Sequence, residues 1–370
     1  MKVVKLKDIC TKGSSSLKQK DVQGKTGKYP VFGASGLIGY IDSYHQEKEY
    51  IGIVKDGSGI GRVMFLPPKS SVIGTLQYIL PKPGYDINYI GYCLKSLDLA
   101  SHKQGAAIPH IYFRDYGEKL VNVEESLDEQ RKIVARLNAA FERIDRMQIN
   151  AETALEEAKG ALAQIIRNSF IPAKDWEEKS IGDLSKDIRY GTSKPSCENG
   201  KYLYLRMNNI TSDGHLTLKD TKTISLEGAE YEKAVVRKGD ILFNRTNSLE
   251  HVGKTCVFDQ EEEMIIAGYL IRVRLKEEII PEFLSYFLNC DTTKTTLRKL
   301  AIGAVHQANI SASSLKKVRI KFPENKAEQE RIVTQIKKIE DKIKALKCNL
   351  DTITEKCNAL KQALLKETFE

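Results

Sequence analysis

The sequence predicts an α+β protein in which two mixed, strand-rich domains are each followed by a long α-helix. The two helices are expected to form an antiparallel coiled coil with pseudo-two-fold symmetry. Two observations support this fold class: the second half of the chain repeats the plan of the first, and each half ends in a long heptad pattern. We expect the domains to span 1–126 and 172–325, and the helices to span 127–171 and 326–370.

The repeat is clearest at the end of each half. A shift of 199 residues aligns these segments without a gap, and the matched pairs include Ile111 with Ile310, Glu129-Gln130 with Glu328-Gln329, and Phe170 with Phe369. Because the repeated unit contains both a globular region and a long helix, the order is domain, helix, domain, helix.

The globular regions have mixed character, with strands prevailing. Segments rich in β-branched and aromatic residues lie on either side of glycine turns, and we expect strands at 50–54, 61–65, 239–243 and 255–258. Two apolar segments have helical spacing, and we expect short helices at 87–97 and 281–290.

The long helices carry an apolar seam in steps of four and three residues. Ten matched positions in each helix are apolar, and the residues that we assign to the seam include Ile133, Leu137, Ile144, Ile165, Ile332, Ile336, Ile343 and Leu364. A lone helix cannot bury so narrow a stripe, so each helix needs a partner. We favour pairing of the two helices with each other, and pairing with another chain stays open.

Composition limits the class of protein. The chain has 370 residues, of which 41% are hydrophobic and 29% charged, with a formal net charge of +9. No segment approaches the roughly 20 apolar residues of a membrane helix, so we expect no membrane association and a cytoplasmic location. The seven cysteines include no Cys-x-x-Cys pair, which favours reduced thiols over disulfides or zinc. A diffuse positive charge permits nucleic-acid binding without demonstrating it.

Catalytic and metal-binding motifs are missing. The glycine-rich segment 56–62 departs from the dinucleotide-binding pattern, and Gly253-Lys254-Thr255 has Ser248 where a phosphate-binding loop needs glycine. The six histidines show no convergent ligand spacing. We therefore predict no catalytic residue, no metal site and no cofactor in this chain.

One repeated signature carries a family resemblance. Gly105-Ala106-Ala107 leads through Ile111 to Leu127-Asp128-Glu129-Gln130-Arg131-Lys132-Ile133-Val134, and the pattern returns from Gly303-Ala304-Val305 to Ala327-Glu328-Gln329-Glu330-Arg331-Ile332-Val333. With these two copies, each followed by a heptad helix, the chain resembles the DNA-specificity subunit of type I restriction-modification systems. The first copy lacks the Gln and Asn that the second has at Gln307 and Asn309.

The resemblance implies a non-catalytic subunit whose globular regions are target-recognition domains and whose helices are conserved spacers. It implies two DNA-methyltransferase subunits that use S-adenosylmethionine, and restriction/translocase subunits that use ATP, as partners. Two separate domains on helices of fixed length would recognise a bipartite double-stranded DNA target with an unspecified gap. Two alternatives stay open: the specificity subunit of a type IIB-like restriction-methylation system, and a coiled-coil adaptor that does not bind DNA.

Candidate DNA-binding residues are polar or basic residues in loops that the repeat places at corresponding positions. Arginine suits guanine, and asparagine or glutamine suits adenine, because each pairs through two hydrogen bonds. The candidates are Lys55, Ser58, Arg62, Gln77, His102, Lys103, Gln104, Arg206, Asn208, Asn209, Arg245, Asn247, Lys254 and Gln307.

Overall fold

A computed structural model describes residues 1–57, 59–105, 109–304 and 307–370. The chain divides into two compact units. Unit 1 consists of Met1–Glu152 together with Asn349–Glu370, and unit 2 consists of Thr153–Cys348. The long helices are α4 (Leu127–Ser169) and α9 (Lys326–Phe369). Because both unit boundaries fall inside these helices, each long helix contributes one end to each unit.

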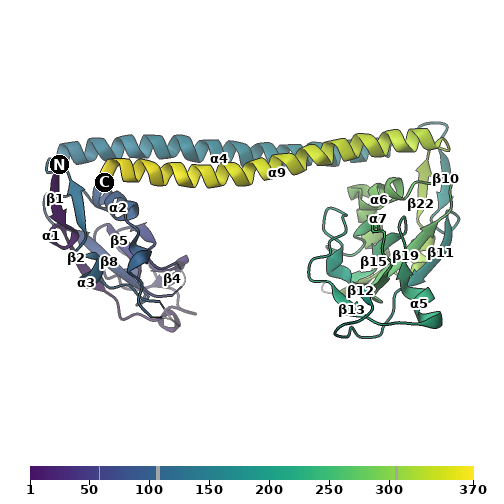
Figure 1. Cartoon of the computed structure of the whole chain (residues 1–370), viewed down its shortest axis with the longest axis horizontal. Coiled ribbons are helices and arrows are strands. Elements are labelled where there is room, and N and C mark those ends of the chain that lie inside the picture. The colour runs from purple at the N-terminus through teal and green to yellow at the C-terminus, as the bar shows by residue number, and fades with distance from the viewer. Residues whose placement is uncertain (58, 106–108, 305–306) are drawn as a thin grey trace. The chain divides into compact units, whose positions relative to one another are not determined.

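The described residues of unit 1 form three sheets (Figure 1). A two-stranded sheet pairs β1 with β9, a four-stranded antiparallel sheet has the order β2-β8-β5-β6, and a mixed sheet has the order β4-β3-β7. The strands are β1 (Lys2–Lys5), β2 (Cys10–Ser14), β3 (Tyr29–Gly33), β4 (Gly36–Ile41), β5 (Tyr50–Val54), β6 (Val63–Leu66), β7 (Ser71–Val72), β8 (Leu76–Pro81) and β9 (Leu120–Val123). The helices are α1 (Leu6–Ile9), η1 (Gln19–Asp21), α2 (Ile87–Ser96), η2 (Leu99–His102) and α3 (Phe113–Tyr116).

Unit 2 repeats this plan with one further sheet. The orders are β10-β22, β11-β19-β15-β17, β13-β12-β18-β14 and β16-β21-β20. The strands are β10 (Glu177–Ser180), β11 (Ser185–Tyr190), β12 (Tyr202–Leu205), β13 (Lys222–Ile224), β14 (Val235–Val236), β15 (Ile241–Asn244), β16 (Thr246–Asn247), β17 (Thr255–Val257), β18 (Met264–Ile266), β19 (Leu270–Leu275), β20 (Ile302–Ala304), β21 (Gln307–Asn309) and β22 (Arg319–Phe322). The helices are η3 (Met207–Asn209), α5 (Gly228–Ala234), α6 (Pro281–Asn289), α7 (Asp291–Leu300) and α8 (Ala312–Lys316).

The predicted α+β class is confirmed, and the expected strands and short helices lie within a few residues of their predicted positions. β6 begins at Val63 rather than at residue 61, and β15 begins at Ile241 rather than at residue 239. Gly59 and Gly61 have left-handed backbone angles of 85° and 82°, so the turn extends further than the glycine pattern suggested.

The long helices run antiparallel in both units. In unit 1 the end of α9 packs against the start of α4: Leu365 and Phe369 share a core with Ile133 and Leu137 (Figure 1). Phe369 also contacts the α2 residue Tyr89, with ring centroids 5.1 Å apart. This core therefore joins α2 to both long helices.

In unit 2 the opposite ends meet. Leu162 and Ile166, near the end of α4, pack against the core that contains Ile332 and Ile336 from the start of α9. Pairing of start with end in both units establishes the antiparallel arrangement, so the helices of this chain are partners of each other.

The predicted seam is correct at some positions and drifts at others. Ile133, Leu137, Ile144, Ile332 and Ile336 are buried, whereas Ile165, Ile343 and Leu364 are only half-buried. The next residue along, Leu365, is buried in place of Leu364, and Leu155 is buried where the heptad pattern placed Ala154. An α-helix drifts by about 20° per heptad relative to a strict repeat of 3.5 residues, so over about four heptads the buried stripe moves by almost one residue.

The repeated Glu-Gln motif has a structural explanation in a buried glutamine. Gln130 is fully buried, and its Oε1 accepts a hydrogen bond of 2.8 Å from the backbone N–H of Asp86. Its Nε2 donates to the carbonyls of Gly84 and Glu124 at 3.2 and 2.7 Å. Gln130 therefore ties the start of α4 to the end of β9 and to the loop that begins α2.

Gln329 makes the same set of contacts in unit 2. It is fully buried, accepts from the N–H of Ile280 at 2.8 Å, and donates to the carbonyls of Glu278 and Pro323 at 3.0 and 2.8 Å. We call these two side chains the glutamine clamps.

Within the described residues, no two cysteines are joined by a disulfide. Five cysteines are buried, while Cys197 and Cys348 are exposed.

Candidate nucleic-acid interface

The central strand of unit 1 ends in a corner that brings two candidate residues together. At the end of β5, the backbone N–H of Val54 donates to Arg62 O at 3.0 Å, and Gly61 N–H donates to Val54 O at 2.8 Å. Lys55 O accepts from Ile111 N–H at 3.0 Å, and this bond joins the segment before α3 to the end of β5. We call this arrangement the first corner.

The central strand of unit 2 ends in the same way. Beyond β15, Asn244 N–H donates to Lys254 O and Gly253 N–H donates to Asn244 O, both at 2.8 Å. Arg245 O accepts from Ile310 N–H at 2.9 Å. In this second corner, Arg245 occupies the position of Lys55, and Lys254 occupies the position of Arg62.

A side-chain pair closes each corner. In the first corner, His110 Nδ1 lies 2.6 Å from Asp56 Oδ1. In the second, Thr246 Oγ1 donates to Asn309 Oδ1, also at 2.6 Å. The two corners therefore share a main-chain frame but carry different polar side chains.

The first corner continues into a surface of aromatic and basic residues that the sequence did not indicate. The Tyr112 ring stacks on His110 with centroids 6.3 Å apart, and the Arg114 guanidinium lies 4.6 Å from the Tyr112 ring centre. Tyr112 is 42% exposed. Gln104 is held nearby, since its Nε2 donates to Asp115 at 3.0 Å. Both Tyr112 and Arg114 directly follow the repeated Ile111, which is the signal that could have found them.

The second corner has its own aromatic support. The Arg245 guanidinium lies 4.7 Å from the centre of the Tyr190 ring, and its Nη1 donates to Gly268 O at 3.3 Å. Asn247 and Gln307 lie on the adjacent strands β16 and β21, with Gln307 exposed. These side chains provide a guanidinium and two amides, the groups that pair with guanine and adenine.

Two predicted site residues are wrong because they belong to the core. Gln77 is 5% exposed, and its amide is hydrogen-bonded to the Tyr116 hydroxyl. Asn209 is fully buried; its Oδ1 accepts from Arg206 N–H at 2.8 Å, and its Nδ2 donates to Thr217 O at 2.9 Å. Neither amide is available to a base, because both are already satisfied inside the fold.

Lys254 and Arg206 both bind backbone carbonyls in or near the loop that contains η3. The Lys254 ammonium donates to the carbonyls of Ile210 at 2.5 Å and Met207 at 3.4 Å, and burial lowers the pKa of Lys254. Arg206 Nη2 donates to Asp220 O at 2.8 Å. These bonds fix the η3 loop beside the second corner and leave the neighbouring Asn208 exposed.

Three further candidates lie at the end of η2 and in the segment that follows it. Lys103 and Gln104 are exposed, and His102 is half-buried at the end of η2. Ser58 lies outside the described residues. Among the residues that the structure describes, no group of His, Cys, Asp or Glu side chains is placed to hold a metal ion. In the same part of the chain, no helix is long and apolar enough to cross a membrane.

Comparison with known proteins decides the family. A family model described as the type I restriction modification DNA specificity domain matches residues 1–157 and 173–355. The chain belongs to this family. Each matched region covers most of one repeat, so the specificity-domain family accounts for the duplicated plan.

Two curated relatives are similar over part of their length. A protein of Methanocaldococcus jannaschii with the provisional name type I restriction enzyme MjaX specificity subunit is 29% identical over 203 residues, which cover 53% of this chain and 46% of that protein. The type I restriction enzyme EcoKI specificity subunit of Escherichia coli is 23% identical over 253 residues, which cover 67% and 54%. The matched regions thus span about half the length of these relatives.

Solved structures share the fold along the whole chain. A chain from a study of complex assembly and conformational transition of the type I R-M system aligns with a TM-score of 0.71 and 18% identity, covering 99% of this chain and 96% of the other. The HsdS subunit from Thermoanaerobacter tengcongensis aligns with a TM-score of 0.57 and 20% identity, covering 99% and 95%. The specificity-domain family fold therefore extends over both units.

Proposed function

We propose that this chain is the specificity subunit of a type I restriction-modification complex, and that each unit recognises one part of a bipartite double-stranded DNA target. The pair of corners is the observation that carries the proposal. Lys55 and Arg245 occupy the same position in one main-chain frame, as do Arg62 and Lys254, yet the side chains around them differ. Two such sites can bind DNA in the same manner while distinguishing different bases.

The chemistry of the corners suits DNA. Lysine and arginine side chains neutralise phosphates, and this sequence-independent contact contributes most of the affinity. Arg245 offers two donors, and Asn247 and Gln307 each offer a donor and an acceptor; such pairs distinguish base edges in the major groove. A small protein element reaches only a few base pairs, so each unit would specify a short half-site, and the helices would set the gap between the two.

The proposal assigns the chemical steps to partner subunits. We expect this chain to be non-catalytic and to recruit two DNA-methyltransferase subunits, which bind S-adenosylmethionine. Restriction/translocase subunits would bind ATP and cut the DNA. The names of the two curated relatives, both type I restriction enzyme specificity subunits, support this assignment.

Methylome sequencing of cells that express the chain with its cognate methyltransferase subunit tests the proposal. We expect a methylated motif with two specific halves. Arg245→Ala should relax one half and Lys55→Ala should weaken the use of the other, whereas Lys174→Ala, which changes an exposed lysine between β10 and α4, should change neither. The reasoning fails if no motif is methylated, or if both corner variants alter the same half.

Two further assays, DNA cleavage and DNA retardation, separate the alternatives. Cleavage at a fixed distance from the motif by a single fused partner would indicate a type IIB-like system. Purified chain that associates with its partner but never retards DNA would indicate an adaptor.

A further inference from the structure

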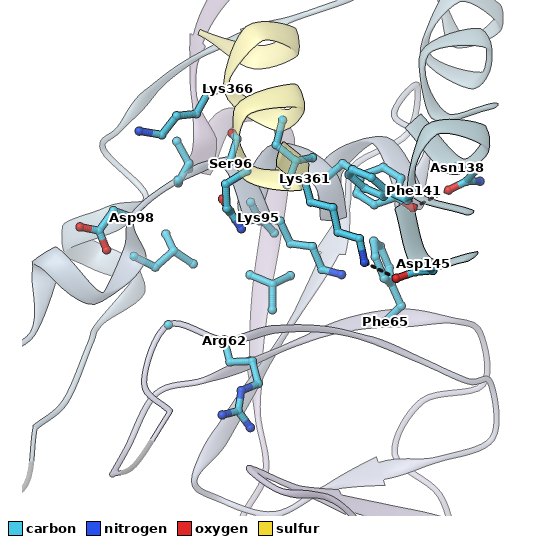
Figure 2. A pocket seen from close by; sticks show the side chains of 18 of the residues that line it. Arg62, Phe65, Lys95, Ser96, Asp98, Asn138, Phe141, Asp145, Lys361 and Lys366 are labelled. Atoms are coloured by element: carbon cyan, nitrogen blue, oxygen red, sulfur yellow. Dashed lines mark hydrogen bonds and ion pairs between the residues drawn. The ribbon is translucent and has the colours of Figure 1, made fainter. Parts of the chain in front are cut away.

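A groove in unit 1 lies between α2, β6 and the ends of both long helices that belong to this unit (Figure 2). It encloses about 1070 Å³. We call it the α2 groove and define it by Phe65, Tyr92, Lys95, Phe141 and Lys361. None of these five residues takes part in the main-chain frame of the first corner.

Aromatic rings form one wall of the α2 groove. The ring centroids of Phe65 and Tyr92 lie 5.4 Å apart, as do those of Tyr92 and Phe141, and both pairs meet edge to face. Gly91 makes this possible, because a Cβ at that position would lie 2.0 Å from the Phe65 ring. The wall is therefore a built apolar surface, which offers a place for an apolar side chain.

Two ammonium groups point into the same space (Figure 2). Lys95 Nζ lies 4.5 Å from the Phe65 ring centre and 5.9 Å from that of Tyr92. Lys361 pairs with Asp145 and lies 5.9 Å from the Phe141 ring centre. Burial, and secondarily the charge of Lys361, lowers the pKa of Lys95. Among the described residues, no carboxylate forms an ion pair with Lys95, so the aromatic faces are its partners.

The charges that line the α2 groove favour an anionic ligand. Five cationic side chains and three carboxylates line it. Two of the carboxylates are already paired, because Asp145 binds Lys361 and Glu142 binds Arg146 at 2.7 Å. Lys95 is thus a half-buried cation without a neutralising group, and an incoming carboxylate would supply one.

The equivalent groove in unit 2 has the opposite charge. The repeat aligns Tyr92 with Tyr286, Lys95 with Asn289 and Phe141 with Glu340. We call this the α6 groove. It encloses about 320 Å³ and contains five carboxylates. Its lining includes Asp213, His215, Asp259, Glu282, Tyr286, Asn289, Lys337, Glu340 and Asp341.

Several polar side chains of the α6 groove are already paired with each other. The Tyr286 hydroxyl donates to Glu340 at 2.6 Å, and Lys337 pairs with Glu282 at 2.9 Å. Burial raises the pKa of Glu340. The fold accepts asparagine and glutamate at the positions of Lys95 and Phe141, so their cationic and aromatic character in unit 1 is not a requirement of the architecture.

We propose that the α2 groove binds an acidic segment of a partner protein. An apolar or aromatic side chain of the segment packs on Phe65 and Phe141, and a neighbouring carboxylate pairs with Lys95. A protein segment fits better than DNA because the cation is recessed against aromatic rings, whereas phosphate contacts use exposed lysine and arginine side chains. The groove reaches Gly61 and Arg62 of the first corner, but Lys95 and the aromatic wall lie outside that corner. A change at Lys95 therefore tests the groove independently of the proposed function.

Selection from a phage-displayed random-peptide library on the full-length chain tests the proposal. We expect enriched peptides with net negative charge and a leucine or aromatic residue. Lys95→Asn, which introduces the residue of the equivalent unit 2 position, should weaken a labelled synthetic copy of such a peptide roughly tenfold in fluorescence anisotropy. Lys95→Glu should abolish its binding. Lys174→Asn, the matched change at an exposed lysine outside the groove, should leave the affinity within about twofold.

Thermal melts of each variant confirm that the fold is intact, and a random-sequence DNA duplex serves as competitor. The duplex should not displace the peptide, and Lys95→Asn should bind the duplex like the unchanged chain. The proposal is overturned if no acidic peptide is enriched, or if enriched peptides bind Lys95→Asn equally well. It is also overturned if the duplex displaces the peptide and Lys95→Asn weakens duplex binding, since the groove would then be a nucleic-acid site.

Discussion

Replacing the glutamine clamp of unit 1 should loosen the start of α4 selectively. Gln130→Leu keeps the volume of the side chain but removes three hydrogen bonds, leaving the N–H of Asp86 and the carbonyls of Gly84 and Glu124 without their partner. A buried hydrogen bond contributes about 1 kcal/mol net, and an orphaned buried group costs about 1–3 kcal/mol. The local free energy of opening should therefore fall by about 3 kcal/mol.

Hydrogen exchange followed by mass spectrometry measures this local change better than a global melt, since two units need not unfold together. About 3 kcal/mol corresponds to a fall in amide protection of roughly a hundredfold. The fall should be confined to peptides from the loop before α2 and the start of α4. Protection in unit 2, where Gln329 is unchanged, should stay the same.

Gln164→Leu is the matched control, because Gln164 lies on the same helix but is exposed. Its effect should stay within about 0.5 kcal/mol. Equal protection in the Gln130→Leu and Gln164→Leu proteins would show that the repeated glutamine does not hold the helix to the domain, and the structural explanation of the Glu-Gln motif would be refuted.

Other predictions concern function and the helices. The purified chain alone should transfer no methyl group from S-adenosylmethionine to DNA and should not cut it; incorporation above a no-protein blank would contradict this. Exchanging residues 1–126 for those of a relative should alter one half of the methylated motif and spare the other. Deleting one heptad from each helix, 148–154 and 347–353, should shorten the pair by about 10 Å and the unspecified gap by up to about three base pairs, as scored by methylome sequencing. Ile336→Asp should destabilise the chain by several kcal/mol, and Ile343→Asp by less, because Ile336 is fully buried and Ile343 is not; equal losses in melting temperature would count against the described seam.

The long helices were predictable because their signal is long and periodic. The pattern located α4 and α9 to within two residues at each end. It was wrong by one residue at Leu155 and Leu365, which are buried next to the predicted positions, because an α-helix does not keep a strict repeat of 3.5 residues. Periodicity identifies the face of a helix, but the rotation of that face along its length depends on the packing.

The burial of polar residues was not predictable from residue type. Gln77 and Asn209 have side chains that suit a base contact, yet both are satisfied inside the fold. Gln130 shows the converse: the repeat marked it as a shared residue, but the three backbone groups that it binds are distant in sequence or in separate elements. Only the tertiary structure brings such partners together.

A repeat in the sequence marks only the positions that both halves share, such as Ile111 with Ile310. It gives no sign of side chains that differ between the two copies. Tyr112 and Arg114 flank the first corner but align with Ser311 and Ser313 in the second half. Similarity between the two halves therefore cannot point to residues such as Tyr112 and Arg114, which differ between them.

The corners are held mainly by backbone amides and carbonyls, and this has a consequence for how the protein changes over time. Hydrogen bonds such as Ile111 to Lys55 and Ile310 to Arg245 do not depend on which side chain the second residue carries. Point mutations at these positions can therefore change the side chain while the main-chain hydrogen bonds of the corner remain. The target preference of this protein can therefore change during evolution through single substitutions, each of which leaves the fold intact.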